Sequence, residues 1–165
     1  MCMSETDVKT PRLTPLELSG VFLAEFPVIA YNSSILVEPY RDGWTGLYDA
    51  PLGHLYWIVT HKGVHRKWGK HDRTTDRYSA VFGVMEVALF DGRDDSPTSG
   101  QLLVVTLDAS KGQGVLIPVG VWHTFRAISD TVVLMNSKTP AYDPEHVDKH
   151  LLPMPNELID FVWSD

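Results

Sequence analysis

Apolar residues fall in short runs along the whole chain, and these runs are rich in Val, Ile, Leu and aromatic side chains. Turn-forming groups such as Arg41-Asp42-Gly43 and Ser129-Asp130 separate nearly all of the runs. The runs begin mostly about ten to twenty residues apart, a spacing typical of antiparallel sandwiches and barrels. The pattern therefore predicts an all-β fold, with a jelly-roll barrel as the favoured architecture. The predicted strands are Val21–Tyr31, Ser34–Pro39, His54–Thr60, Tyr78–Phe90, Gln101–Leu107, Gly114–Pro118, His123–Ile128 and Thr131–Asn136.

One segment near the end of the chain departs from this pattern. Asn156 can cap a short helix over Asn156–Trp163, and this helix would carry Leu158, Ile159 and Val162 on its apolar side. We therefore expect a jelly roll with a short C-terminal helix.

The domain organisation follows from length and composition. A chain of 165 residues with 44% apolar residues suits one domain with a sizeable core. We find neither an internal repeat nor a linker, and predict a polar N-terminal tail over residues 1–18 and a single domain over residues 19–165. No apolar run approaches the roughly 18 residues of a membrane-spanning helix. The first residues also lack the apolar stretch of a secretory signal.

Charge and cysteine content narrow the partners and the compartment. A net charge of −7 argues against a nucleic-acid partner, because phosphate backbones require a basic surface. Cys2 is the only cysteine and cannot form an internal disulfide, which suits a reducing compartment. We expect a cytoplasmic protein that binds neither nucleic acid nor membranes.

A basic cluster interrupts this acidic chain. The segment His61–Arg77 holds six of the fourteen Lys and Arg residues and three of the seven His residues, with only two acids. Converging cations are what a diphosphate or another anionic ligand requires. A solvated hairpin loop would have a similar composition, but this cluster directly follows the predicted strand His54–Thr60 and includes His65, which can point inward.

A second segment with candidate chemistry is Gly112–Ala127. Gly112, Pro118, Gly120 and His123 have the spacing of most of the second motif of the cupin superfamily, which ends in Asn where this chain has Ala127. We expect His123 to face a cavity, although a single His on a strand can also be a packed core residue. The first cupin motif, a His-x-His pair with a Glu, is missing. If the loop folds back, His65, His71 and His123 could still bind iron, zinc or manganese.

Taken together, these segments resemble the dTDP-4-dehydrorhamnose 3,5-epimerase family, a non-metal branch of the cupins. The resemblance runs in order over about residues 20–150 and implies a cupin-type double-stranded β-helix. The family's Arg-Gly-Leu-His corresponds here to Lys62-Gly63-Val64-His65, and its D-V-A-V-D followed by SPTFG corresponds to Glu86-Val87-Ala88-Leu89 with Ser96-Pro97-Thr98-Ser99-Gly100. Its I-P-P-G-F-A-H-G-F corresponds to Ile117-Pro118-Val119-Gly120-Val121-Trp122-His123-Thr124-Phe125. Its S-D-T followed by Y-Y-A-P-E-H corresponds to Ser129-Asp130-Thr131 with Ala141-Tyr142-Asp143-Pro144-Glu145-His146.

The resemblance also implies roles for particular residues. His65 would be the catalytic base and His123 a pocket residue. Lys62 would bind the diphosphate, and Tyr142 would pack near the nucleotide base. Arg66 belongs with these substrate-binding residues. The family implies a homodimer, a nucleotide-sugar ligand and no cofactor.

Three of the family's catalytic positions differ in this chain. The catalytic Tyr falls on Asn136, which cannot donate a proton in its place and is counted here as a substrate-binding residue. The Lys falls near Thr75–Arg77, where Arg77 keeps the charge as a second catalytic residue. The Asp that pairs with the catalytic His falls within Leu152-Pro153-Met154-Pro155, which holds no carboxylate, so Asp148 or another acid would have to replace it.

The function that these residues favour is an epimerase or isomerase of a nucleotide-activated 4-keto-6-deoxy sugar. A ketone at C4 acidifies the neighbouring C–H bonds, and a His of near-neutral pKa can remove such a proton. Two alternatives stay open: a metal-dependent cupin enzyme, and a non-catalytic cupin that binds sugar nucleotides.

Overall fold

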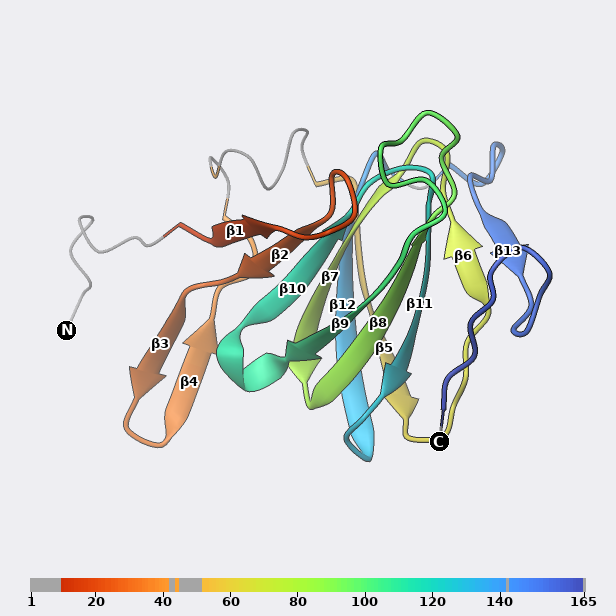
Figure 1. The fold of residues 1–165 in the computed structure, drawn as a ribbon. Coiled ribbons are helices and arrows are strands. Elements are labelled where there is room, and N and C mark those ends of the chain that lie inside the picture. Colours follow the sequence, from red (N-terminus) through yellow and green to blue (C-terminus); the bar gives the residue numbers. More distant parts are fainter. Residues whose placement is uncertain (1–9, 42–43, 45–51, 142, 165) are drawn as a thin grey trace.

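The computed structural model describes residues 10–41, 44, 52–141 and 143–164 of the chain. Thirteen strands fill most of this part (Figure 1). They are β1 (Arg12–Pro15), β2 (Phe22–Glu25), β3 (Val28–Tyr31), β4 (Ser34–Val37), β5 (His54–His61), β6 (Trp68–Lys70), β7 (Thr75–Phe82), β8 (Val84–Asp91), β9 (Leu102–Asp108), β10 (Gln113–Ile117), β11 (Val121–Ala127), β12 (Thr131–Thr139) and β13 (His150–Leu152).

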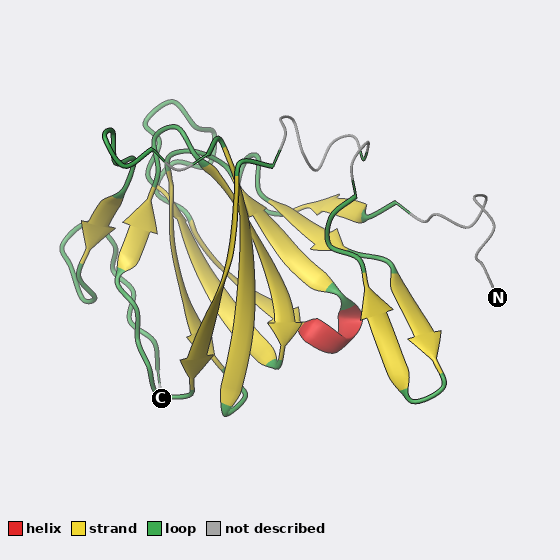
Figure 2. Ribbon diagram, turned by 180° about the vertical axis from the view of Figure 1, so that it is seen from behind, coloured by secondary structure: helices red, strands yellow, loops and turns green. Residues whose placement is uncertain are grey.

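Two antiparallel sheets form the body of the protein. One has six strands in the order β1-β2-β10-β7-β12-β5, and the other has five in the order β13-β6-β11-β8-β9. The hairpin β3–β4 forms a separate pair beside them (Figure 2). Neighbours in each sheet come from distant parts of the sequence, as in β10 beside β2 and β11 beside β6. This is the predicted all-β cupin jelly roll.

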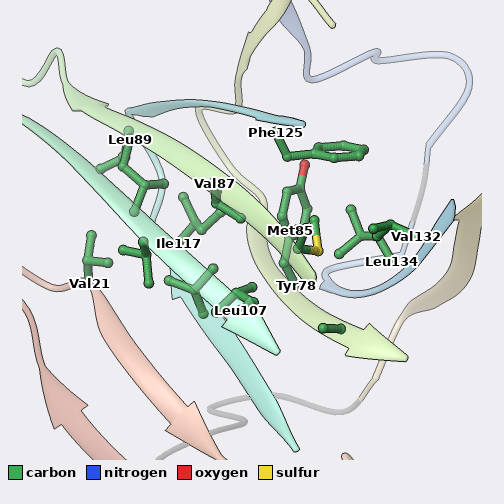
Figure 3. Packing of buried hydrophobic residues seen from close by; sticks show 14 of the residues in the cluster. Val21, Tyr78, Met85, Val87, Leu89, Leu107, Ile117, Phe125, Val132 and Leu134 are labelled. Carbon is green, nitrogen blue, oxygen red and sulfur yellow. The ribbon is translucent and has the colours of Figure 1, made fainter. Parts of the chain in front are cut away.

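The main core lies between the two sheets. Strands that face it bury alternate side chains, because successive residues of a strand point to opposite faces. Val87 and Leu89 from β8, Ile117 from β10 and Leu134 from β12 are all buried in this cluster (Figure 3). The core continues up to Tyr78 and Phe125, where the polar residues of the cavity region begin.

The chain crosses from one sheet to the other at Gly83. The sequence predicts one long strand over Tyr78–Phe90, but the structure divides this run into β7 and β8, which lie in different sheets. Gly83 has a φ of +78°, and a Cβ there would lie 2.5 Å from the carbonyl oxygen of Thr131. Only glycine fits this crossing without strain.

The C-terminal helix predicted over Asn156–Trp163 is wrong. Asn156 does accept hydrogen bonds from the backbone N–H groups of Leu158 and Ile159, as a cap would, but no helix follows. Instead, Ile159 and Trp163 are buried and the residues between them alternate in exposure, so the segment packs in an extended form. The described ranges contain one short 3-10 turn, Ala109–Lys111, and no helix long and apolar enough to cross a membrane.

The domain also begins earlier than predicted. Strand β1 and the buried residue Leu18 both lie within the range assigned to the polar tail. Strand β1 pairs with β2, and Leu18 joins the main core. The boundary at residue 18 was therefore placed too late, because the short segment Arg12–Pro15 forms an edge strand.

A buried carboxylate fixes the turn between β8 and β9. Asp91 accepts hydrogen bonds from the Arg93 guanidinium at 2.7 and 2.8 Å and from the hydroxyls of Ser96 and Thr98 at 2.6 Å each. Burial alone would raise the pKa of Asp91, but these hydrogen bonds outweigh it and hold the pKa far below its ordinary value. The ionised form is therefore the one that stabilises the fold.

This network predicts a pH-dependent effect of Asp91→Asn. Because the pKa of Asp91 is lower in the folded state, its stabilisation is present above the unfolded pKa of about 4 and is lost as the pH falls below that value. We expect Asp91→Asn to lower the free energy of unfolding by about 2 kcal/mol at neutral pH. The deficit should shrink in acid. Guanidinium denaturation at neutral and acidic pH measures it, and an equal deficit at both would contradict the assignment.

Candidate active site

The polar residues between the sheets come from neighbouring positions on three strands. Strand β7 contributes Asp76 and Tyr78, strand β12 contributes Asn136 and Lys138, and strand β11 contributes His123. In the register of β7 and β12, Asp76 pairs with Lys138 and Tyr78 pairs with Asn136. The alternation of side chains then points all four toward the same face of the sheet.

Asp76 lies at the centre of this group, and only 1% of its surface is exposed. Its Oδ1 accepts a hydrogen bond from Asn136 Nδ2 at 2.6 Å and lies 3.1 Å from Lys138 Nζ. Its Oδ2 lies 3.5 Å from His71 Nε2 and 3.6 Å from His123 Nε2. A buried carboxylate needs such partners, since an isolated charge between the sheets would be strongly destabilising.

Backbone carbonyl groups orient both imidazole rings. His123 Nδ1–H donates to the carbonyl oxygen of Val121 at 3.1 Å, and His71 Nδ1–H donates to the carbonyl oxygen of Asp148. The Nε2 atom of each ring therefore faces Asp76. His71 Nε2 also lies 3.0 Å from Lys138 Nζ, so it accepts a hydrogen bond from the ammonium group.

Burial and charge act against each other on the two most enclosed groups. Burial alone would raise the pKa of Asp76, but the electrostatic influence of His123, Lys138 and His71 outweighs it and leaves the pKa below its ordinary value. Burial lowers the pKa of His123, although the charge of Asp76 opposes this change. At neutral pH, Asp76 is ionised and His123 is neutral.

Two cavities adjoin this cluster. The smaller one, about 340 Å³, is lined by residues that include His65, Asp76, Tyr78 and His123. The larger one, about 690 Å³, is lined by residues that include His54, Arg73, Lys138 and Val147. The residues Tyr56, His71 and Lys149 line both cavities, so the two are neighbouring parts of one cleft.

Cations surround the cleft. Partial burial lowers the pKa of Lys149, and the nearby charges of Lys138 and Arg66 lower it further. Arg66 and Lys67 line the smaller cavity, and the Arg66 guanidinium lies 5.1 Å from the ring centre of Phe125. Cations that repel one another in this way favour the binding of an anion.

Of the site residues predicted on the basic loop, some line the smaller cavity and others do not. His65 and Arg66 are exposed at the mouth of the smaller cavity, whereas His123 is 6% exposed and lies at its floor. Lys62 is also exposed, but among the described residues it is not part of the lining of either cavity.

Of the other predicted site residues, one lies in the cluster and one lies away from it. Asn136 lies in the cluster, where it donates hydrogen bonds to Asp76 and to the Tyr56 hydroxyl. Arg77 was expected to carry the second catalytic charge, but it lies on the opposite face of β7, donates to Thr139 Oγ1 at 3.0 Å and lines neither cavity in the described part of the chain. On the inward face of β7 and β12, the charged groups are instead Asp76 and Lys138. Tyr142 lies outside the described residues.

Asp148 has a structural function that the sequence does not reveal. Its carboxylate accepts hydrogen bonds from the backbone N–H groups of Asp72 and Arg73 and from the Thr74 hydroxyl, at 2.8 to 2.9 Å. Its backbone carbonyl holds His71. Asp148 therefore positions His71 and the loop around it, and makes neither a hydrogen bond nor an ion pair with His65.

Sequence reasoning missed Asp76, Lys138 and Tyr78 as site residues. Asp76 is one of the two acids in the basic cluster, and its side chain points to the opposite face of the strand from that of its neighbour Arg77. The pairing of β7 with β12 brings Lys138 beside it across 62 positions of sequence, which no local motif indicates. The alternation of β7 could have placed Asp76 and Tyr78 together on the inward face.

The protein is a cupin jelly roll whose cleft combines buried imidazoles, a carboxylate–ammonium pair and surrounding cations. This combination suits acid–base chemistry on an anionic small molecule. The family model of dTDP-4-dehydrorhamnose 3,5-epimerase matches residues 57–163, and the chain belongs to that family. This confirms the resemblance seen in its motifs. The chain is accordingly an enzyme of the nucleotide-sugar epimerase class.

Individual relatives agree with this assignment. The chain is 33% identical over 149 residues to the probable low-salt glycan biosynthesis epimerase Agl13 of Haloferax volcanii, covering 89% of this chain and 95% of Agl13. The crystal structure of a dTDP sugar isomerase from Desulfovibrio desulfuricans has a TM-score of 0.81 at 24% identity, covering 88% and 92% of the two chains. ChmJ of Streptomyces bikiniensis, a 3'-monoepimerase in complex with dTDP-quinovose, has a TM-score of 0.79 at 21% identity, covering 92% and 78%.

The contact between Asp76 and Lys138 predicts strong coupling between their substitutions. Lys138→Met leaves a buried carboxylate without its ammonium partner and should lower the free energy of unfolding by about 3–5 kcal/mol. Adding Asp76→Asn removes the unpaired charge and should recover part of this loss. Chemical denaturation of the wild type, both single variants and the double variant measures the coupling. Effects that add without coupling would contradict the pairing.

Proposed function

We propose that this enzyme inverts one carbon next to the ketone of a nucleotide-activated 4-keto-6-deoxy sugar, with His65 as the base. The observation that supports this most directly is the placement of two proton-carrying groups on one cavity. The imidazole of His65 is exposed at its mouth, and the phenol of Tyr78 is buried at its floor. A sugar ring held between them would present its two faces to the two groups.

His65 suits the removal of a proton. Its ring lines the smaller cavity, and in the described part of the chain no carboxylate or carbonyl group is hydrogen-bonded to it. Its ring nitrogens are therefore available to take up a proton from carbon.

Tyr78 suits the return of a proton on the opposite face. Its ring packs edge-on against His123 and Phe125, at centre distances of 5.5 and 5.8 Å, and its oxygen lies at the end nearest Phe125 (Figure 3). Burial raises the pKa of Tyr78, and the charge of Asp76 raises it further, so the hydroxyl keeps its proton. Asn136, which the resemblance places at the position of the family's Tyr, has only amide protons, and these are too weakly acidic to be transferred.

Cations around the cleft would stabilise the negative charges of the substrate. The Lys149 ammonium lines both cavities and could bind the oxygen of the enolate that forms when the proton leaves. Arg66 and Lys67 at the mouth, with Lys62 nearby on the same loop, would bind the diphosphate. The larger cavity, with Tyr56 among its lining residues, would take the nucleotide, and Tyr142 is proposed to pack near the base. No cofactor enters this reaction.

The test of His65 is exchange of hydrogen between solvent and substrate. In D₂O, we expect the wild type to incorporate deuterium next to the ketone of dTDP-4-keto-6-deoxyglucose. His65→Ala should slow this exchange by on the order of 100-fold or more, because the base is lost. Affinity for dTDP should stay within about tenfold, since His65 is not among the lining residues of the larger cavity, which is proposed to take the nucleotide. Mass spectrometry and NMR follow exchange and inversion separately.

Tyr78→Phe gives a sharper result in the same assay. The variant keeps the ring and the base but loses the proton donor, so deuterium exchange should continue while inversion falls. His61→Ala is the matched control, because His61 is an exposed residue of the same region that hydrogen-bonds to Thr131 and should behave as the wild type. Unchanged exchange in His65→Ala would remove His65 from the mechanism. Binding of dTDP without any exchange by the wild type would favour a non-catalytic sugar-nucleotide-binding cupin.

We further propose that the enzyme is a homodimer in the cytoplasm. The outer face of edge strand β5 exposes Leu55, Trp57 and Val59 in a row, and 70% of Trp57 is accessible. Apolar rows of this kind on a sheet edge are typical of an interface. The lone Cys2 supports the reducing compartment.

The dimer predicts a clear effect of Trp57→Asp. A carboxylate at the centre of the apolar row would have to be buried in the interface, so the variant should sediment as a monomer while the wild type sediments at twice the mass of the chain. Val162→Asp serves as the control, because Val162 is also apolar and exposed, at 57%, but lies on the C-terminal segment. A monomeric wild type in analytical ultracentrifugation would refute the dimer.

A further inference from the structure

We propose that Tyr56 is a further catalytic residue of this enzyme, whose hydroxyl donates a hydrogen bond to the ketone oxygen of the substrate. This hydrogen bond would strengthen when His65 removes the neighbouring proton, because the ketone oxygen then becomes the negatively charged oxygen of an enolate. The inference rests on the proposed function and gives that oxygen a second donor beside Lys149.

Strand register places Tyr56 in a row of polar side chains on the inward face of the six-stranded sheet. Tyr56 of β5 pairs with Asn136 of β12, and Asn136 pairs in turn with Tyr78 of β7. Along β5, Tyr56 lies between the exposed residues Leu55 and Trp57, so its own side chain points inward. Tyr56 accordingly lines the smaller cavity together with Tyr78.

The amide of Asn136 holds the Tyr56 hydroxyl. Asn136 Oδ1 accepts a hydrogen bond from the backbone N–H of Arg77 at 3.2 Å, and Nδ2 donates to Asp76 Oδ1 at 2.6 Å. A backbone N–H can only donate and a carboxylate can only accept, so these two neighbours decide the orientation of the amide. The remaining hydrogen on Nδ2 is donated to the Tyr56 oxygen at 2.9 Å.

This contact leaves the hydrogen of the Tyr56 hydroxyl for the substrate. Because the Tyr56 oxygen accepts from Asn136, its own hydrogen is directed elsewhere, and no acceptor for it lies within the described ranges. The side chain is half-buried in the wall of the cleft. A donor on the phenol oxygen also stabilises the negative charge that builds up there when the O–H group donates, which makes the hydroxyl a stronger donor.

Several other donors near the floor of the cleft are committed to the protein. The Lys138 ammonium lies 3.1 Å from Asp76 Oδ1 and 3.0 Å from His71 Nε2, so its charge balances that of Asp76. His71 and His123 each direct Nδ1–H at a backbone carbonyl oxygen. The charge that develops on the substrate is therefore left to donors such as Tyr56.

Each group then has one task in the reaction. His65 takes the proton from the carbon next to the ketone, and the electron pair of that C–H bond forms the double bond of the enolate. Tyr56 keeps its proton and donates a hydrogen bond to the enolate oxygen, where the negative charge collects. Tyr78 returns a proton to the carbon from the opposite face and the ketone re-forms. His65 and Tyr78 regain their starting protonation by exchange with water.

The test is Tyr56→Phe, which removes the hydroxyl and keeps the ring. We expect deuterium exchange into dTDP-4-keto-6-deoxyglucose and inversion to slow together, each by on the order of 100-fold, as when one donor to an oxyanion is lost. The KM and the affinity for dTDP should change by less than about threefold, since the hydrogen bond strengthens only as the proton leaves. Mass spectrometry and NMR in D₂O follow exchange and inversion.

Tyr31→Phe is the matched control, because it deletes the same hydroxyl from an exposed tyrosine of β3 that lines neither cavity of the cleft in the described part of the chain. It should exchange deuterium as the wild type does. Asn136→Leu is a second variant, which keeps Tyr56 but removes the amide that orients it. It should slow exchange by about tenfold. Circular dichroism and dTDP binding identify a variant that fails to fold.

Two results would overturn the role of Tyr56. One is wild-type exchange in either folded variant, which would leave Tyr56 with a structural role only. The other is exchange that continues in Tyr56→Phe while inversion is lost, because Tyr56 would then deliver a proton to carbon. A wild type that shows no exchange at all would instead overturn the proposed function itself, so the two failures are distinguishable.

Discussion

The charge of one carboxylate, enclosed between two sheets, organises the centre of this protein. Asp76 could not stay ionised at 1% exposure without the Lys138 ammonium group and the Asn136 amide on one of its oxygens. Asn136 and Lys138 come from the neighbouring strand β12, and backbone carbonyl groups hold the rings of His71 and His123. The cleft is therefore pre-organised, because its polar side chains are fixed before any substrate enters.

The jelly roll provides this arrangement through strand register. The pairing of β7 with β12 sets a carboxylate directly opposite an ammonium group, and the loop after β6 carries His71 back over them. Asp148 fixes that loop from the far end of the chain. Within the family, the position near Arg77 is expected to carry a positive charge. Here the positive charge on the inward face comes instead from the adjacent strand.

Much of the fold was predictable, because short apolar runs and turn signals are local properties. The motif around His123 also placed that residue correctly on the cavity. The remaining site depends on contacts between distant strands, which no local spacing encodes. Lys138 and Asp76 were therefore missed, and Arg77, which was expected to carry a catalytic charge, faces away from the cleft. The C-terminal helix failed for a related reason: the cap at Asn156 is real, but burial of Ile159 and Trp163 against the sheet favours an extended chain.

The most direct test is the ionisation of the Asp76 carboxyl group. Carbon NMR of the aspartate side chains, followed through a pH titration, distinguishes a carboxylate from a carboxylic acid. The structure predicts that Asp76 is a carboxylate at neutral and mildly acidic pH, because its buried cationic surroundings hold its pKa below the ordinary value. A protonated Asp76 carboxyl group at neutral pH would contradict the account.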